Sequence, residues 1–443
     1  MASISSLGVG SGLDLNGLLD QLQEAEQQKL VPIQQQQAEQ ETKISAYGQL
    51  QSALSEVQSS ASDLNDPELF NSVTSNVEGD GVEAAATPDA PPGRYNVDVE
   101  RMATASSIAT QGVDQEAILN AGAEASLDVA LNNDGTPTNI TVDADSTLGD
   151  VRDAINESDA GVSASIVFDG NQHRLALASK ETGQQAAIDT VAFNGLDGLA
   201  LDDATKIEGQ DAKLNVNGIE INSASNQVED AIQGTTLSLT DTGETTVTVA
   251  RDEESIRGAI TGFVDSYNDM KSTTADLTSF SSEDGETQAG DLLGDSTTRM
   301  AESRLRSTMT ESVGEDGLQT LEDAGISMNV DGELEIDDEQ LDESLSTQPG
   351  AVQTLFAGTD ESAGIAGRVE EELDTMLGAN GMVEGAVTGA ENQMDRLDER
   401  YSSMEDSIAS TVDRYRTQFQ ELDSMVSEMN QTSDYLTQQL SGM

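Results

Sequence analysis

Apolar residues recur every three or four positions near both ends of the chain. Near the C-terminal end these positions are Met394, Leu397, Tyr401, Met404, Ile408, Val412, Tyr415, Phe419, Leu422, Val426 and Met429, and near the N-terminal end they are Ile44, Tyr47, Leu50, Leu54, Val57, Ala61 and Leu64. This spacing places each set on one face of a helix. A long helix with one narrow apolar stripe needs a helical partner in water, either the other terminal helix or a second copy. The pattern favours a structural or assembly protein over an enzyme with a pocket.

Capping residues and prolines set the expected boundaries of the N-terminal helices. Asp14 is the expected N-cap of a first helix that carries a leucine stripe. Pro32 disfavours helix at Val31 and can occupy the first turn of the next helix. That second helix is expected to end at Asn65-Asp66-Pro67, because proline cannot continue it.

The apolar spacing changes to two after about Phe70, and Thr, Gly, Asn and Asp dominate from there to about Ala250. Tyr95, Val97 and Val99 alternate with polar residues, which predicts a half-buried strand. The middle of the chain is therefore expected to be rich in β-structure.

A short internal repeat lies within this β-rich middle. The first copy runs from Ile140 to Val167 and the second from Ile219 to Leu239. Each copy is expected to fold as a strand, a short capped helix and a strand. The expected helices contain Asp153-Ala154-Ile155 in the first copy and Asp230-Ala231-Ile232 in the second.

Helical spacing returns after Arg251, starting with Ile256 and continuing to Met270. Asp331-Gly332 between β-like residues predicts a hairpin turn. Asp337 resembles the start of a capped helix, which Pro349-Gly350 should end. The last long helix is expected to begin between Gly378 and Thr388.

These expectations give an α+β fold in which a helical leg and coiled-coil-like terminal helices carry inserted β-rich head domains. The expected parts are a terminal helical region of residues 1–43 and 391–443, a leg of 44–70 and 251–390, a β-rich head domain of 71–105 and 206–250, and a nested α+β head domain of 106–205.

The chain is strongly acidic. It has 83 Asp and Glu against 20 Lys and Arg, for a formal net charge of -63. Such a surface repels phosphate, so neither nucleic acid nor an anionic membrane is an expected partner. The acidity is typical of halophilic proteins, in which high salt screens the repulsion.

Sequence signals for catalysis, cofactor binding and metal binding are weak. There is no Cys, and the single His173 is expected to be an exposed residue of a hairpin turn. The glycine run Gly8-Val9-Gly10-Ser11-Gly12 follows no strand and is interpreted as a flexible tail. Residues 327–338 only partly match a calcium loop, and a plain hairpin is preferred. We therefore expect no catalytic residue, cofactor or metal.

Targeting signals are also weak. The N-terminal residues lack a basic region and a long apolar core, so a cleaved secretory signal is not expected. No apolar run approaches the ~20 residues of a membrane-spanning helix. These signals alone indicate a cytoplasmic protein, although a dedicated export route would leave no such trace.

Short motifs in one consistent order resemble flagellar hook-associated protein 2, the family of filament cap proteins. The motifs are Gly10-Ser11-Gly12-Leu13-Asp14-Leu15-Asn16, Pro92-Gly93-Arg94-Tyr95-Asn96-Val97-Asp98-Val99, Asp153-Ala154-Ile155-Asn156, Phe263-Val264-Asp265-Ser266-Tyr267-Asn268, Gly294-Asp295-Ser296-Thr297, Gly325-Ile326, Leu355-Phe356, Arg414-Tyr415-Arg416-Thr417-Gln418-Phe419 and Tyr435-Leu436-Thr437-Gln438-Gln439-Leu440. Each motif is weak alone, but the ordered set spans nearly the whole chain.

The resemblance implies a secreted protein of the bacterial flagellum that leaves the cell unfolded through the flagellar type III channel. It implies a homo-oligomeric ring, often described as a pentamer, at the filament tip, where it guides flagellin into place. The implied partners are flagellin, the hook-filament junction protein and a flagellar export chaperone.

The terminal helices are expected to carry the partner-binding residues. These are Leu15, Leu18, Leu19, Leu22, Phe419, Leu422, Val426, Met429, Leu436 and Leu440. An alternative function is a surface adhesin that uses the exposed β-rich head, with the helices as a stalk. An enzyme of the cell envelope is the least favoured reading.

Overall fold

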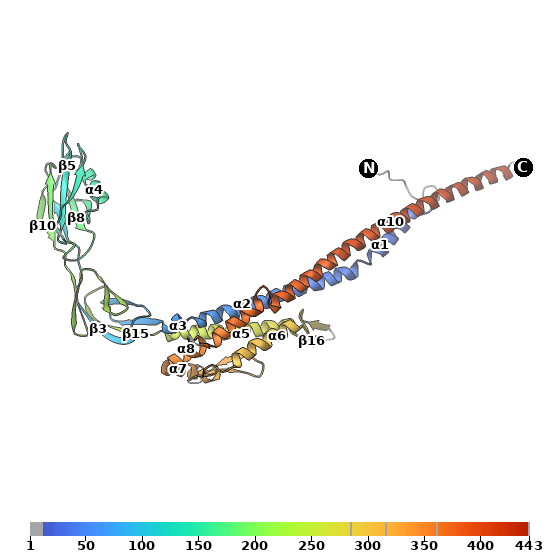
Figure 1. Ribbon diagram of the computed structural model, residues 1–443. Coiled ribbons are helices and arrows are strands. Elements are labelled where there is room, and N and C mark those ends of the chain that lie inside the picture. The colour runs from blue at the N-terminus through green and yellow to red at the C-terminus, as the bar shows by residue number, and fades with distance from the viewer. Residues whose placement is uncertain (1–11, 134, 284–285, 315–316, 360–361, 442–443) are drawn as a thin grey trace. The chain divides into compact units, whose positions relative to one another are not determined.

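The computed structural model describes residues 12–133, 135–283, 286–314, 317–359 and 362–441. The chain divides into two compact units (Figure 1). The helical unit comprises residues 1–67 and 255–443, and the head unit comprises residues 68–254. The α+β fold class predicted from the sequence is confirmed.

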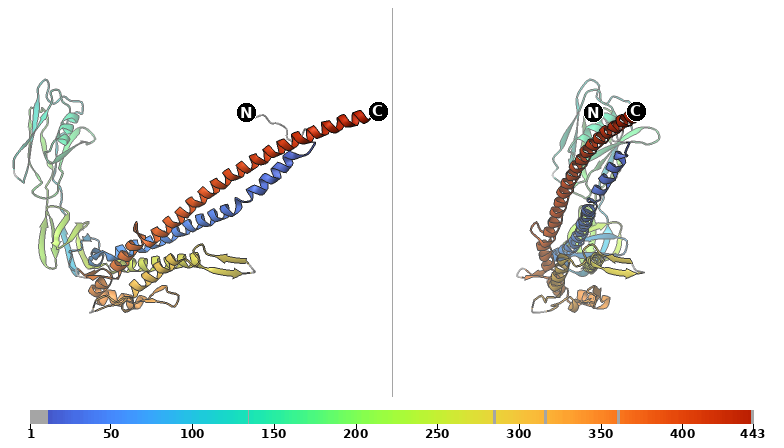
Figure 2. Two further views of the ribbon diagram at one scale, coloured as in Figure 1. Left: turned by 45° about the vertical axis from the view of Figure 1, so that its right-hand side comes forward. Right: turned by 90° about the vertical axis from the view of Figure 1, so that its right-hand side faces the viewer.

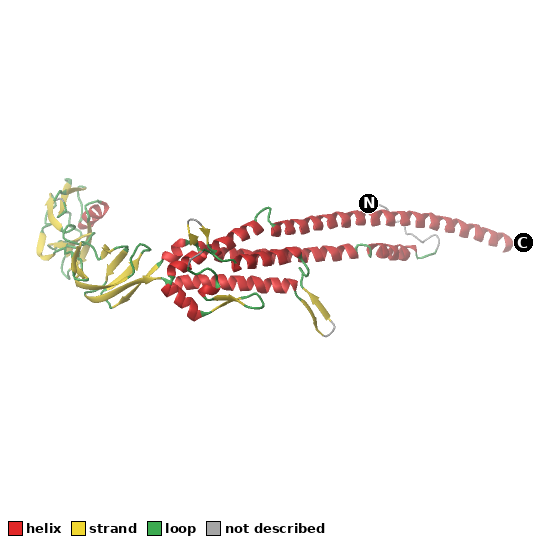
Figure 3. Ribbon diagram, turned by 60° about the horizontal axis from the view of Figure 1, so that its bottom comes forward, coloured by secondary structure: helices red, strands yellow, loops and turns green. Residues whose placement is uncertain are grey.

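Within the described residues, the helical unit consists of long and short helices and three short hairpins (Figure 3). Its helices are α1 (Leu15–Gln27), α2 (Val31–Asn65), α5 (Glu253–Thr278), α6 (Ser296–Thr310), α7 (Asp338–Thr347), α8 (Pro349–Phe356), α9 (Ile365–Leu377) and α10 (Met382–Ser441), with a 3-10 turn at Glu322–Ala324. Its hairpins are β16 (Phe280–Glu283) with β17 (Glu286–Ala289), β18 (Ile326–Met328) with β19 (Leu334–Ile336), and β20 (Gly358–Thr359) with β21 (Ser362–Ala363).

The predicted N-cap of the first helix and the predicted end of the second are confirmed, whereas Val31, where Pro32 was expected to disfavour helix, is the first residue of α2. The Asp14 carboxylate accepts a 3.0 Å hydrogen bond from the Gly17 backbone N–H, which satisfies one free donor at the start of α1. Pro32 lies in the first turn of α2, and α2 ends at Asn65. The predicted α2 stripe is buried from Tyr47 to Leu64, whereas Ile44 is half-buried.

The predicted hairpin at Asp331-Gly332 is also confirmed, and it is fixed to α5. Met328 pairs with Leu334 across the hairpin, and Gly332 has a φ of +81°, which favours glycine. The Tyr267 hydroxyl donates to the Gly332 carbonyl at 3.1 Å. Burial raises the pKa of Tyr267 to about 12. The sequence pattern therefore located the hairpin, and α5 determines where it packs.

The head unit is mainly antiparallel β-structure. Its strands are β1 (Val73–Glu78), β2 (Val82–Ala86), β3 (Gly93–Arg101), β4 (Ser107–Thr110), β5 (Ala125–Leu131), β6 (Thr138–Val142), β7 (Val162–Phe168), β8 (His173–Ser179), β9 (Ile188–Asn194), β10 (Leu201–Ile207), β11 (Ala212–Val216), β12 (Ile219–Ser223), β13 (Gln227–Ile232), β14 (Thr235–Leu239) and β15 (Gly243–Arg251), and its helices are α3 (Pro67–Asn71) and α4 (Leu148–Glu157).

Two hydrophobic cores organise these strands. The sheets β1-β15-β3-β11-β12 and β13-β14-β2 enclose one core, which includes Val97, Val99 and Val247. The sheets β10-β4-β8-β7 and β6-β5-β9, together with α4, enclose the other, which includes Leu127 and Ile155. In β3, Val97 and Val99 are buried and Tyr95 is half-buried, so the alternation predicted from the sequence is observed.

The first copy of the internal repeat folds as predicted. The Asp150 carboxylate accepts hydrogen bonds from the Thr147 backbone N–H at 2.8 Å and from its hydroxyl at 2.7 Å, at the start of α4. Near the end of α4, the Asn156 side chain bonds both backbone groups of Ala164 in β7, at 2.8 and 2.9 Å. The strand, helix and strand are therefore connected by polar side chains as well as by the core.

The helix predicted in the second copy of the repeat is wrong. Residues Gln227–Ile232 form strand β13, which pairs with β14. The Ser225 hydroxyl accepts from the Gln227 backbone N–H, which makes a local turn, and no carboxylate stands where Asp150 stands in the first copy. Val228 and Ile232 are each 4% exposed, because both side chains enter the β core.

The expectation that His173 is an exposed turn residue is also wrong. His173 begins β8 and is half-buried, with its ring centroid 4.9 Å from that of Phe168. Its backbone N–H donates to the Val113 carbonyl at 2.9 Å. The hairpin tip is instead formed by the residues that follow Phe168.

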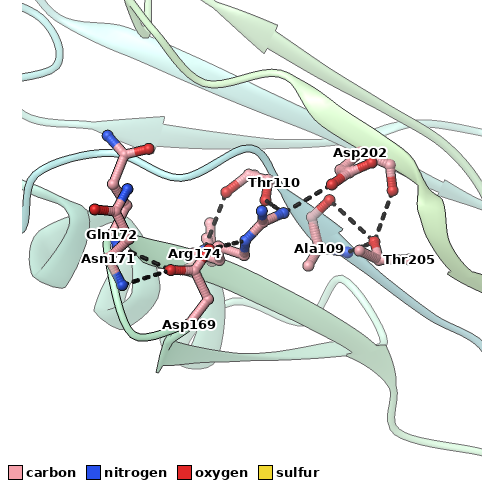
Figure 4. A network of polar contacts seen from close by, with 9 residues as sticks. Ala109, Thr110, Asp169, Asn171, Gln172, Arg174, Asp202 and Thr205 are labelled. Atoms are coloured by element: carbon pink, nitrogen blue, oxygen red, sulfur yellow. Dashed lines mark hydrogen bonds and ion pairs between the residues drawn. The ribbon is translucent and has the colours of Figure 1, made fainter.

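Arg174 joins this hairpin to the rest of its sheet (Figure 4). Its guanidinium group lies 2.8 Å from the Asp169 carboxylate and 2.7 Å from the Asp202 carboxylate of β10. Hydrogen bonds from the Gln172 backbone N–H and from Arg174 lower the pKa of Asp169 to about 2. A charged network therefore connects β8, β10 and the β7–β8 turn.

Candidate assembly surface on the terminal helices

The first helix packs against the last one. Leu19, Leu30, Ile408 and Val412 form a buried cluster, and Tyr401, Met404, Tyr415 and Phe419 pack against it with partial exposure. These residues come from both ends of the chain. The stripe on α10 therefore has an internal partner along part of its length.

Two side-chain contacts set the register between α2 and α10. The Gln34 amide lies 3.3 Å from the Tyr401 hydroxyl, and the Gln37 amide lies 2.5 Å from the Asp398 carboxylate. As the residue number rises on α2 it falls on α10, so the helices are antiparallel. Extending this register along α1 places Leu15 beside Phe419 and Gln420.

The C-terminal part of α10 continues past the start of α1 (Figure 2). From Glu421 to Ser441 no described residue of α1 lies opposite the helix. This part of α10 extends for roughly 30 Å at the rise of an α-helix. It is therefore a helix with an apolar stripe and no covering helix in the described part of the chain.

The predicted partner-binding residues on α1 occupy two faces. Leu15 and Leu19 are buried, and Leu22 is half-buried. Leu18 is 45% exposed, because it lies on the other side of the helix. The structure therefore uses part of this leucine set inside the chain and leaves Leu18 accessible.

The predicted residues on α10 become more exposed toward its C-terminal end. Phe419 and Val426 are half-buried, and Leu422 is 40% exposed. Met429, Leu436 and Leu440 are 64%, 53% and 74% exposed. We call Phe419, Leu422, Val426, Met429, Leu436 and Leu440 the C-terminal seam. Large apolar side chains with this exposure on one helix face make the seam a candidate interaction surface.

The sequence reading missed Leu30 as a contact residue. Leu30 is 8% exposed and packs with Ile408 and Val412, although it lies in the short turn between α1 and α2. Leu30 comes just before Val31-Pro32 and does not belong to the leucine stripe of α1. The helical pattern therefore did not include it. A sequence signal was present, since Leu30 and Ile33 are apolar and three positions apart, and both are buried.

The arrangement suits docking between helices. In the described residues, no three His, Asp or Glu side chains are grouped so that they could hold a metal ion. No described helix is long and apolar enough to cross a membrane. Acidic residues in the last part of α10 are Glu421, Asp423, Glu428 and Asp434.

Comparisons with known proteins agree with this architecture. The family profile "Flagellar hook-associated protein 2 C-terminus" matches residues 209–431, the N-terminal profile of the same family matches residues 11–106, and a "Flagellin hook IN motif" matches residues 126–181. The chain is 35% identical to flagellar hook-associated protein 2 of Salmonella typhimurium, over 100% of this chain and 99% of the relative. It is 34% identical to the protein of that name from Escherichia coli, over 99% and 98%.

A solved structure shows the same fold. The D1-D2-D3 domains of the flagellar cap protein FliD from Escherichia coli superpose with a TM-score of 0.63 at 29% identity, over 78% of this chain and 99% of that one. The match in sequence extends over the full chain, and the match in fold includes both helices and sheets. The chain therefore belongs to the flagellar hook-associated protein 2 family, structural proteins without enzymatic activity that cap the flagellar filament outside the cell.

Proposed function

We propose that this chain forms a cap at the distal tip of the flagellar filament, promotes flagellin polymerisation and prevents the loss of flagellin monomers. The observation that carries the proposal is the C-terminal seam, which continues on α10 beyond the start of α1. An apolar stripe on an uncovered helix suits docking among other helices. Flagellin and other copies of this chain are the proposed partners at the tip.

Further partners follow from the same helices. An export chaperone would cover the C-terminal seam before secretion, because Leu436 and Leu440 are exposed and apolar. Contact with the hook-filament junction protein belongs to the same proposal, since a cap must first sit on the hook.

The division into terminal helices, leg, β-rich head and nested head stays a proposal with the boundaries stated above.

Deletion of the gene tests the proposed function. A deletion strain should lack filaments and release flagellin monomers into the medium, and the full-length chain supplied in trans should restore filaments. Electron microscopy and detection of flagellin in the culture supernatant measure both outcomes. Normal filaments in the deletion strain would contradict the proposal.

An adhesin is the second candidate, and it rests on two exposed apolar residues at the end of β7. Val167 is 50% exposed and Phe168 is 58% exposed, and both lie on the head unit. Replacing both by serine should abolish attachment of the bacteria to a surface while filaments still form. Unchanged attachment would remove this second function without affecting the cap.

A further inference from the structure

We propose that the Asn156 side chain blocks the outer edge of strand β7 and so prevents β7 from pairing with β7 of a second copy. β7 is the last strand of the sheet β10-β4-β8-β7, in which it pairs with β8. A strand at the edge of a sheet offers a row of backbone groups to which another strand can add. The inference concerns the head unit and does not depend on the proposed cap function.

The backbone groups of Ala164 face this outer edge. The Lys180 backbone N–H of the neighbouring chain segment donates to the Gly161 carbonyl at 2.9 Å, so Gly161 faces the β8 side. Successive residues of an antiparallel strand direct their backbone groups to opposite sides. Ala164, Ile166 and Phe168 therefore all face away from β8.

The Asn156 side chain occupies both backbone groups of Ala164. Its amide nitrogen donates to the Ala164 carbonyl at 2.9 Å, and its amide oxygen accepts from the Ala164 N–H at 2.8 Å. A side-chain amide has the donor and the acceptor of a peptide group, so it takes the place of one residue of an added strand. The edge that remains, from Ile166 to Phe168, is about three residues long, at the short end of the range for strands.

The sequence of β7 gives it no other protection. Edge strands are commonly protected by charged side chains, such as Glu220 in β12 and Asp202 in β10. β7 contains neither a charged residue nor a proline, and its register with β8 is unbroken from Val162 to Phe168. Val167 and Phe168 are apolar and exposed. Without Asn156, β7 would be a regular, uncharged and partly apolar edge.

A second copy of β7 is the occupant that the charges favour. At a net charge of -63, most surfaces of this chain repel a second copy. Two β7 strands that pair antiparallel about a two-fold axis bring no charge of their own into the contact. Copies held close together, as in the proposed cap, would need this protection most.

The same arrangement occurs at a strand of the helical unit. The Asn268 amide of α5 donates to the Leu334 carbonyl at 2.9 Å, and it accepts from the Leu334 N–H at 2.8 Å. Leu334 begins β19, which pairs with β18 on its other side. An asparagine on a helix therefore covers the outer edge of a strand in both units.

Crosslinking through one introduced cysteine tests the block, because the natural chain has no Cys. Ser165→Cys places a thiol on an exposed position of β7 in every variant. Asn156→Ala removes the block, and α4 should stay folded because Asn156 is exposed and alanine favours helix. Asn194→Ala is the matched control, since the exposed Asn194 amide bonds the Asp128 side chain at 2.7 Å rather than a strand backbone.

The full-length proteins are treated with a short bismaleimide crosslinker in 1 M salt, where the Debye length is about 3 Å. The covalent dimer is quantified on a denaturing gel, and circular dichroism verifies folding. Asn156→Ala should form dimer roughly tenfold faster than the parent with Asn156, because the freed groups of Ala164 add about one net backbone hydrogen bond to strand pairing. Equal rates for Asn156→Ala and Asn194→Ala would overturn the inference.

A charge on the edge separates strand pairing from general unfolding. Val167→Lys, added to Asn156→Ala, should return the crosslinking rate to that of the parent, because a lysine in an edge strand opposes pairing. Fast crosslinking that persists with Val167→Lys would contradict the block, since the association would then not involve β7. Hydrogen exchange is a second measurement. The β7 amides of Asn156→Ala should exchange more slowly as protein concentration rises, and exchange independent of concentration would also overturn the inference.

Discussion

The Tyr47 hydroxyl in α2 donates a 2.7 Å hydrogen bond to the carboxylate of Asp295, which is also the N-cap of α6. One carboxylate thus connects two helices of the leg and starts one of them. Burial and the Asp295 carboxylate raise the pKa of Tyr47 well above its usual range. Burial alone would raise the pKa of Asp295, but hydrogen bonds from Thr298 and Tyr47 lower it overall.

Removing the Tyr47 hydroxyl should destabilise the helical unit. Tyr47→Phe leaves the half-buried Asp295 carboxylate without one donor, which should lower the free energy of unfolding by about 1 kcal/mol. Urea denaturation followed by circular dichroism measures the change. Tyr435→Phe is the matched control. Tyr435 is 62% exposed on α10, so the loss of its hydroxyl should leave the free energy of unfolding unchanged.

The Asp295 carboxylate should make the helical unit sensitive to acid. Its folded pKa lies below its unfolded pKa, so its contribution to stability is present above the unfolded value of about 3.9 and is lost as pH falls through the folded value. Asp295→Asn keeps an N-cap but does not titrate. The stability difference between the natural chain and this variant should shrink below about pH 4. A constant difference from pH 3 to 7 would contradict this account.

The sequence predicted α2, α5, α7 and α10, whose apolar residues follow the helical period, but it did not predict α6 or α9. The α2 stripe from Tyr47 to Leu64 is buried as its spacing indicates. The second repeat copy failed because the β core determined the conformation of Val228 and Ile232, and local capping signals around Ser225 were too weak to oppose it. Helix α8, which begins at Pro349, was read only as the end of α7.

The candidate site was predictable as a stripe but not in its extent. The spacing identifies Leu422 and Leu436 as members of one face. It does not show how far α1 reaches, because the register depends on the Gln34 and Gln37 contacts across the helix pair. It also did not separate Leu18 from Leu19, which differ from 45% to 6% in exposure because they face opposite ways.

Arg174 should stabilise the nested part of the head through its two carboxylate partners. Arg174→Lys keeps the charge but loses the planar fork that reaches Asp169 and Asp202 together. The thermal midpoint of the head unit should fall. Arg152→Lys is the control, because Arg152 pairs only with its exposed neighbour Asp153 among the described ion pairs. Equal midpoints for both variants would contradict the role given to Arg174.

Assembly should strengthen with salt. At -63 per chain, ring formation brings like charges together. Raising salt from 0.1 M to 1 M shortens the Debye length from about 10 Å to about 3 Å and relieves the repulsion. Light scattering across a salt series should therefore show larger species at high salt. Larger species at low salt would count against both this expectation and the proposed adaptation to high salt.

The most direct test of the central claim is a charge placed in the C-terminal seam. Leu422→Asp combined with Leu436→Asp puts carboxylates where another helix must pack, and burying them unpaired is too costly for the contact to form. The control, Ser424→Asp combined with Gln431→Asp, adds the same charge on the opposite exposed face.

Both variants are expressed in the deletion strain, and secretion, head folding and filament number are measured. The control should restore filaments and swimming. The seam variant should be secreted with a folded head, yet leave the cells without filaments and with flagellin in the medium. Full swimming with the seam variant would contradict the claim that this face of α10 docks the cap.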